Sequence, residues 1–116
     1  MNFENMSDED ILKIADPIMD NLMDASTEIN YEKHVRDFTD RMKAIVTKDY
    51  LEKVCKQYQS EKGFFTERDV IAVFKRPDSA AIIWRQNFSV AKGDFVAEMV
   101  IVNINGKYLV DHAMVF

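Results

Sequence analysis

The sequence is poor in the residues that build covalent, metal and phosphate sites. Its 116 residues include one cysteine, two histidines and three glycines. The lone Cys55 excludes an internal disulfide and suits a reducing compartment, so we expect a cytoplasmic protein. The histidines and the cysteine lack the paired spacing of metal ligands, and the scattered glycines form no phosphate-binding loop. We therefore expect neither a metal nor a cofactor.

Positive charge and long apolar runs are also scarce. Fifteen lysines and arginines are outnumbered by 20 acidic residues, which gives a net charge of −5. Nucleic acids and anionic membrane surfaces both select basic faces, so we expect neither as a partner. No apolar run approaches the ~20 residues of a transmembrane helix. The opening "MNFENMSDED" is acidic where a signal peptide would be basic and then apolar.

The first half of the chain has apolar residues at helical spacing. Ser7 and Asp10 resemble a capping box in front of a long amphipathic stripe. Pro17 interrupts that stripe, so we expect a kink or a break there. Asp16, Asp20 and Asp24, which recur every four residues on this helix, are interpreted as a solvated face. The pattern predicts three helices over 8–29, 31–45 and 48–62, capped by Ser7, Asn30 and Thr47, with Gly63 ending the third.

After Gly63 the apolar period changes to two, which predicts strands. Short turn signals join them, and Asn105-Gly106 fits a type I′ hairpin turn, which needs two positive φ angles. Such short connections require antiparallel neighbours. The sequence therefore predicts an α+β fold over residues 1–116 as a single domain, with a four-stranded meander of strands at 69–76, 80–90, 94–104 and 108–116, and "FFTERD" as a short irregular strand in front of it.

Asp111 and His112 are adjacent near the end of the chain and raise the question of a catalytic dyad. Successive side chains of a strand point to opposite faces, so His112 shares a face with Tyr108 and Val110 while Asp111 faces the other way. A base and its orienting carboxylate must lie within hydrogen-bond reach. We therefore reject the dyad unless a bulge interrupts the strand.

The segment "NYEKHVRDFTDRMKAIVTKDYLEKVCKQYQSEKG", four hairpin-linked strands and the ending "NGKYLVDHAMVF" together resemble the nuclear transport factor 2-like superfamily of cystatin-like α+β cones. The pattern is similar to that of small uncharacterised bacterial members. The resemblance implies three helices on the concave face of a curved antiparallel sheet, with a pocket inside the cone. The superfamily includes ketosteroid isomerase and dehydratases, and also binding modules.

Two classes of function are compatible with this sequence. The first is a non-catalytic domain that binds a small apolar ligand, assembles as a dimer, or does both. The alternative is an acid–base enzyme of the ketosteroid isomerase or dehydratase type, with His112 as the base. We favour the first class, although His112 can also be a core histidine held by one hydrogen bond. The predicted pocket residues are His112, Tyr108, Asn103, Gln86, Tyr31 and Trp84.

The strands also predict a homodimer. Alternate residues of a strand share one face, and most of the large aromatics of the strands, among them Phe74 and Phe116, fall in one of the two alternating sets. This set is assigned to the core. The opposite class is apolar where a solvated face should be polar, so we expect a second subunit to cover it. The predicted interface residues are Ile83, Arg85, Val96, Glu98, Val100 and Val102. His34 lies beside the apolar stripe of the second helix and is interpreted as a surface histidine.

Overall fold

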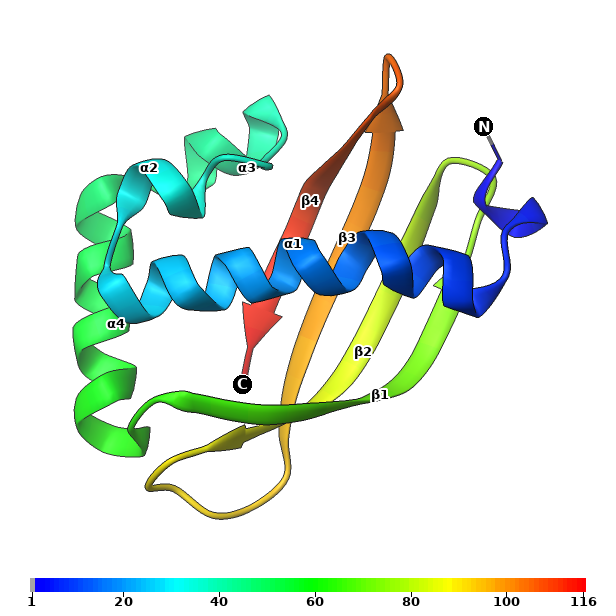
Figure 1. Ribbon diagram of the computed structural model, residues 1–116. Helices are drawn as coiled ribbons and strands as arrows, with labels where there is room; N and C mark the ends of the chain where they lie inside the picture. The colour runs from blue at the N-terminus through cyan, green and yellow to red at the C-terminus, as the bar shows by residue number, and fades with distance from the viewer. Residues whose placement is uncertain (1) are drawn as a thin grey trace.

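Helix α1 crosses one face of an antiparallel sheet in the computed structural model, which describes residues 2–116 (Figure 1). The face that α1 covers is called the inner face below, and the opposite one the outer face. No described helix has both the length and the apolar character to cross a membrane. The elements are the 3-10 turn η1 (Phe3–Asn5), α1 (Asp8–Glu28), α2 (Tyr31–His34), α3 (Asp40–Ile45), α4 (Lys48–Lys62), β1 (Phe65–Lys75), β2 (Ser79–Phe88), β3 (Phe95–Ile104) and β4 (Lys107–Val115).

Helix α1 begins and packs as the sequence predicts. The Ser7 hydroxyl accepts a hydrogen bond from the backbone N–H of Asp10 at 3.1 Å, so the cap is formed. The helix continues through Pro17 without a break. Its residues Ile11, Ala15 and Met19 are buried in the core that α1 shares with the inner face of the sheet. Burial of this stripe is the main force that holds α1 on the sheet.

The predicted continuous second helix is wrong, because residues 37–39 pair with β4. The Thr39 N–H donates to the Val110 carbonyl at 3.0 Å, and the Val110 N–H donates to the Asp37 carbonyl at 2.7 Å. These bonds require extended backbone, so α2 ends at His34 and α3 starts anew. Thr39 caps α3 by accepting from the Met42 N–H at 3.2 Å. The apolar stripe is kept nevertheless, since Phe38 and Met42 are both buried.

The sheet is the predicted meander, with strands in the order β1-β2-β3-β4. The turn between β3 and β4 has φ angles of 54° at Asn105 and 84° at Gly106, as a type I′ turn requires. The Asn103 side chain supports this turn by accepting from the Gly106 N–H at 2.9 Å. The expected separate strand "FFTERD" is instead the start of β1, where the pairing with β2 is irregular between Phe65 and Arg68.

A β-bulge at Asp111 overturns the predicted alternation in β4. Val110 pairs with Ile101 and His112 pairs with Val100, so Asp111 is an extra residue with no partner position on β3. Before the bulge, Tyr108 and Val110 face inward, as expected. Beyond it the order is reversed: Ala113 and Val115 face inward, and His112 and Met114 face outward.

Two aromatics assigned to the core lie on the outer face instead. Phe74 pairs with Ala81 and is 57% exposed, and Phe116 pairs with Val96 and is 55% exposed. For Phe74 the cause is the pairing next to the β1–β2 turn, where even-numbered residues of β1 lie opposite odd-numbered residues of β2; the register shifts between Val70 and Ala72, so Val70 lies opposite Trp84. For Phe116 the cause is the bulge at Asp111. Even-numbered residues that face inward in one strand therefore do not imply that even-numbered residues face inward in the next strand.

Candidate functional site

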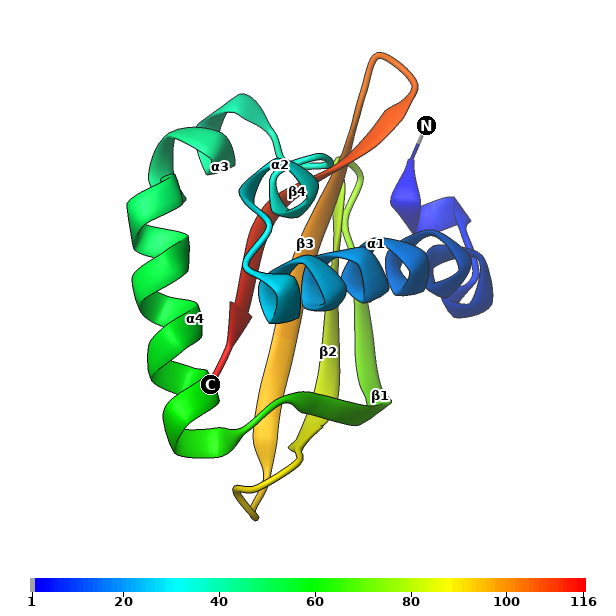
Figure 2. The ribbon, with the colours of Figure 1, turned by 60° about the vertical axis from the view of Figure 1, so that its left-hand side comes forward.

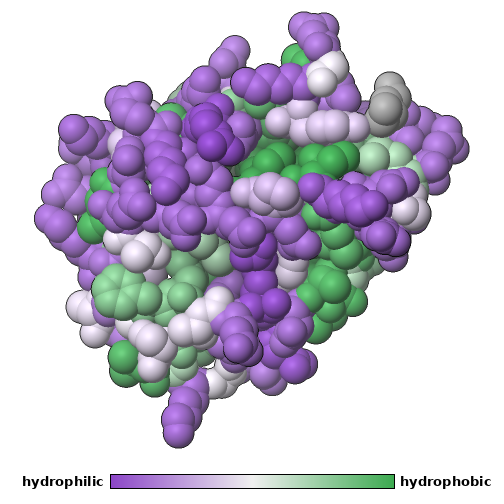
Figure 3. All heavy atoms as spheres, viewed as in Figure 1, coloured by the Kyte–Doolittle hydropathy of each residue, from purple (hydrophilic) through white to green (hydrophobic). Residues whose placement is uncertain are grey.

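A cavity of about 410 Å³ lies between α1, α4 and the last residues of β4. Figures 1 and 2 both show α4 standing beside the end of β4, on the side away from β3. In Figure 3, side chains of lower polarity gather between α4 and β1, below the strongly polar band of α1. Most of the wall is apolar and includes Met19 and Met23 of α1, Leu51 and Val54 of α4, and Ala113 and Val115 of β4.

Stacked aromatic rings close the end of the cavity near the C-terminus of α4. The Tyr58 ring stacks on Phe65 with centroids 4.9 Å apart, and Phe65 contacts Phe88 at 5.2 Å. All three rings line the cavity. The Lys62 ammonium lies 5.8 Å from the Phe88 centroid, a distance at which a cation is attracted by the ring face. These contacts fix α4 to the ends of β1 and β2.

A hydroxyl cluster joins α1 to α4 at the cavity wall. The Ser26 hydroxyl is 2.8 Å from the Tyr58 hydroxyl and 3.2 Å from the Cys55 sulfur. Burial raises the pKa of the Cys55 thiol, and burial also raises the pKa of Tyr58. Both groups therefore stay protonated at neutral pH. A protonated thiol is a weak nucleophile, so Cys55 is an unreactive residue of the core.

His34 lines the cavity, and its interpretation as a surface histidine is wrong. Burial lowers its pKa from 6.5 to about 4, so the imidazole is neutral at pH 7. Its ring packs edge-on against Phe38, with centroids 5.3 Å apart. Its Nδ1 atom is buried and has no hydrogen-bond partner among residues 2–116. The one signal in the sequence was its place four residues before Phe38, the spacing of a shared helical face.

His112 lies outside this cavity, contrary to the prediction that it faces the interior. The bulge at Asp111 turns its side chain to the outer face, where Nε2 lies 3.5 Å from Glu98 Oε1. The side chain is 41% exposed. The other predicted pocket residues do not line the cavity either. Trp84 and Gln86 are buried in the core, Asn103 supports the β3–β4 turn, Tyr108 packs on Phe3, and Tyr31 packs at the edge of the core.

Asp111 and His112 have separate partners, so these two residues do not form a dyad. The Asp111 carboxylate accepts from the Thr39 hydroxyl at 2.9 Å and from Arg41 Nε at 3.1 Å. The hydrogen bond from Arg41 is the main cause that holds the pKa of Asp111 below its ordinary value. This carboxylate therefore ties α3 to β4 at the bulge.

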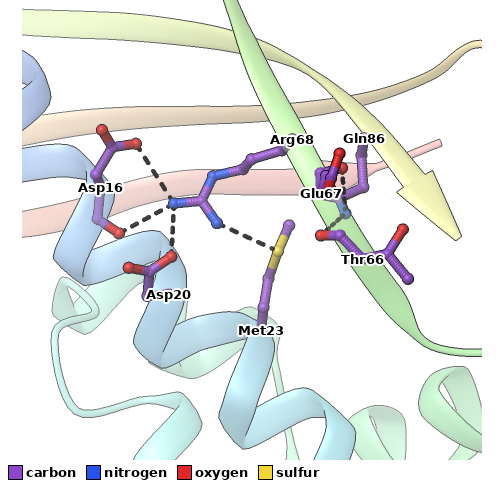
Figure 4. A network of polar contacts seen from close by, with 7 residues as sticks. All are labelled: Asp16, Asp20, Met23, Thr66, Glu67, Arg68 and Gln86. Atoms are coloured by element: carbon purple, nitrogen blue, oxygen red, sulfur yellow. Dashed lines mark hydrogen bonds and ion pairs between the residues drawn. The ribbon is translucent and has the colours of Figure 1, made fainter.

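The acidic run on α1 contributes to the attachment of β1. Arg68 reaches across from the inner face of β1 and lies 2.8 Å from Asp20 and 3.4 Å from Asp16 (Figure 4). Its guanidinium also lies over the Trp84 ring, 5.3 Å from the centroid. Two of the three aspartates expected on a solvated face are thus paired, although both remain substantially exposed. Within the described residues no three ligand-type side chains converge as a metal site would require.

Comparison with known proteins identifies the fold. No family model matches the sequence, and no curated protein does. A solved NTF2-like protein of unknown function from Methylobacillus flagellatus KT is similar over 99% of this chain and 97% of its own, with a TM-score of 0.59 and 12% identity. One from Shewanella baltica OS155 covers 97% of both chains, with a TM-score of 0.58 and 8% identity. The fold is nuclear transport factor 2-like. A DUF4783 family protein from Bacteroides uniformis ATCC 8492 is also similar, over 83% of this chain and 93% of its own, with a TM-score of 0.51 and 16% identity.

The nuclear transport factor 2-like sheet leaves an apolar outer face. The residues predicted for a dimer interface are neighbours there: Ile83 pairs with Glu98, and Arg85 pairs with Val96. Val100 and Val102 continue the same face along β3. Exposed Phe74 and Met114 extend it onto β1 and β4. The charged groups are few, and Glu98 is engaged by His112.

Proposed function

We propose that this protein binds a small, uncharged, apolar ligand in the cavity between α1, α4 and β4, and that it does so without catalysis. The observation that carries the proposal is the cavity itself. Its volume of about 410 Å³ falls within the range of about 300–1,000 Å³ typical of small-molecule sites. Apolar walls with a few fixed polar groups are also typical of such sites.

The polar groups of the cavity favour a neutral ligand with one polar end. His34 lines the cavity with a neutral imidazole, which favours an uncharged ligand over an anion. The Ser26 and Tyr58 hydroxyls offer a second polar contact. We expect these two groups to orient the ligand and the methionine-rich wall to adapt to its shape.

The acid–base alternative requires His112 as the base inside the cavity, but His112 lies on the outer face of the sheet. The cavity groups with shifted pKa values do not replace it. His34, Cys55 and Tyr58 are all shifted toward the neutral form, away from pH 7. General acid–base catalysis is most efficient when the pKa lies near the working pH. These shifts support ligand binding over proton transfer.

Native mass spectrometry of the purified protein tests the proposal, because a retained molecule adds its mass to the chain. A fluorescent uncharged dye, N-phenyl-1-naphthylamine, provides a second probe. Val54→Trp places a large ring on the cavity wall and should reduce both ligand retention and dye binding by about tenfold. Lys53→Trp, on the exposed side of α4, is the matched control and should leave both unchanged. Equal binding by the two variants would reject the cavity as the site.

We also propose that the outer face of the sheet forms a homodimer. Most of its residues are apolar, and they are contiguous across all four strands; such a patch on a monomer would be larger than usual. A second copy is the occupant that this face suits, because the pair Arg85 and Glu98 allows opposite charges to meet across a two-fold axis.

A further inference from the structure

We infer that the ligand of the cavity is a peptide segment, extended and apolar at alternate positions, that adds as a strand to the free edge of β4. This inference rests on the proposed function, since it concerns the same cavity. It goes further in naming the chemical class of the ligand and the backbone groups that bind it.

Strand β4 is the last strand of the sheet, so one of its edges faces away from β3. Only the first part of this edge is covered by another segment. Residues 37–39 pair with Val110 there, through one hydrogen bond in each direction. The side chains of Thr39 and Arg41 then hold Asp111 at the bulge. No described segment pairs with the edge beyond Asp111.

The hydrogen bonds of β3 and β4 show which backbone groups face that open edge. Phe116 and Val96 exchange both of their N–H···O bonds, at 2.6 and 2.8 Å. In an antiparallel pair such residues alternate with residues whose N–H and C=O point away from the partner strand. Ala113 and Val115 hold these alternate positions, so their backbone groups point toward the open edge. Among the described residues, no hydrogen bond from outside the sheet reaches them.

The open edge and the cavity are the same place. Ala113 and Val115 line the cavity, and the inner side of α4, with Leu51 and Val54, forms its opposite wall. Figure 2 shows α4 running beside this end of β4. Backbone donors and acceptors therefore face an otherwise apolar space, where groups left without partners are costly.

A peptide is the occupant whose partial charges complement this wall. Ala113 and Val115 each present one donor and one acceptor at strand spacing, and a second backbone offers acceptors and donors at the same spacing. A hydrocarbon ligand would leave all of these groups unpaired. The edge of another folded sheet would bring its neighbouring strand into the place of α4. A single added strand avoids that clash and directs alternate side chains toward Met19 and Met23.

Amide hydrogen exchange by NMR tests the inference with an internal control. The probe is a pool of uncharged hexapeptides, acetylated and amidated at their ends, with valine, leucine or phenylalanine at alternate positions and threonine or glutamine between them. Peptides selected from the pool on the immobilised full-length protein are added to it in solution. Exchange at Ala113 and Val115 should slow at least about tenfold, while exchange at Met114, whose N–H points to β3, should not change.

Backbone N-methylation separates strand addition from simple apolar binding. The N-methylated form of each selected peptide keeps the side chains but loses backbone donors, and should bind at least about tenfold more weakly. If the two forms bind equally, or if Ala113 and Val115 show no added protection, strand addition is wrong. If no peptide binds but Val54→Trp still abolishes dye binding, the cavity proposal stands and the peptide inference fails. If neither dye nor peptide binds, both fail. Protection of Ala113 and Val115 that rises with protein concentration alone would assign the edge to a second copy.

Discussion

His34 carries no charge at pH 7, because burial lowers its pKa to about 4. In the unfolded chain its pKa is near 6.5, so between these values the unfolded state takes up a proton that the folded state does not. Stability should therefore fall as the pH drops from 6.5 toward 4, by at most roughly 3 kcal/mol from this residue. Urea unfolding across that range should show a shallower pH dependence for His34→Gln than for the wild type. Lys53→Gln, on the exposed side of α4, is the control and should keep the wild-type slope, because lysine does not titrate in this range. An unchanged slope in His34→Gln would show that the ring is solvated.

Arg68 and its aspartate partners should differ in their effect on stability. The Arg68 side chain is only 13% exposed and packs on Trp84, whereas the Asp20 side chain is 65% exposed. Arg68→Met keeps the packing but removes the hydrogen bonds to α1, so we expect a loss of about 1–2 kcal/mol. Asp20→Asn should cost less than about 1 kcal/mol, because water replaces an exposed partner easily. Chemical denaturation compares the two, and equal losses would contradict this ranking.

Elements with local signals could be predicted from the sequence, and elements set by distant contacts could not. The cap at Ser7 and the Asn105-Gly106 turn depend on neighbouring residues, and both form as expected. The bulge at Asp111 depends on Thr39 and Arg41, and the break after α2 depends on Val110. Nothing near these residues in the sequence indicates such partners.

The candidate site was missed for the same reason. Its walls come from α1, α4 and β4, whose separation is a property of the whole fold. The partial burial of His34 follows from that arrangement and has only a weak local signal. The outer-face residues of β2 and β3 were placed well, because those strands are regular and alternate without interruption.

Gly63 connects α4 to β1 and should tolerate no side chain. Its φ is 87°, and a Cβ there would lie 2.2 Å from the Ser89 hydroxyl oxygen and 2.9 Å from a Val90 methyl carbon. Gly63→Ala should therefore cost at least about 2 kcal/mol, from backbone strain and the clash together. Gly106→Ala isolates the strain, since Gly106 has a φ of 84° and no atom within 4 Å of the added Cβ. Urea unfolding should show the larger loss for Gly63→Ala, and equal losses would rule out the clash.

At the scale of the whole molecule, the apolar outer face predicts self-association. Val100 lies near the middle of this face, between Ala81 on β2 and His112 on β4. A lysine there would be desolvated without a partner if two sheets packed together. Light scattering at micromolar concentration should give the mass of two chains for the wild type and of one chain for Val100→Lys. Lys53→Glu, on α4, should leave the mass unchanged. A wild-type mass of one chain would reject the dimer.

The bulge at Asp111 determines which face of the sheet each of the last residues of β4 points to. If the same residues ran as a regular strand, Asp111 would lie opposite Val100, so His112 and Met114 would turn inward and Ala113 and Val115 would turn outward. The bulge is held by two residues outside the sheet, because Thr39 and Arg41 donate hydrogen bonds to the Asp111 carboxylate. Deletion of Asp111 itself would therefore keep His112 to Val115 on their present faces, whereas loss of the bulge with Asp111 kept in the strand would exchange the cavity wall with the outer face.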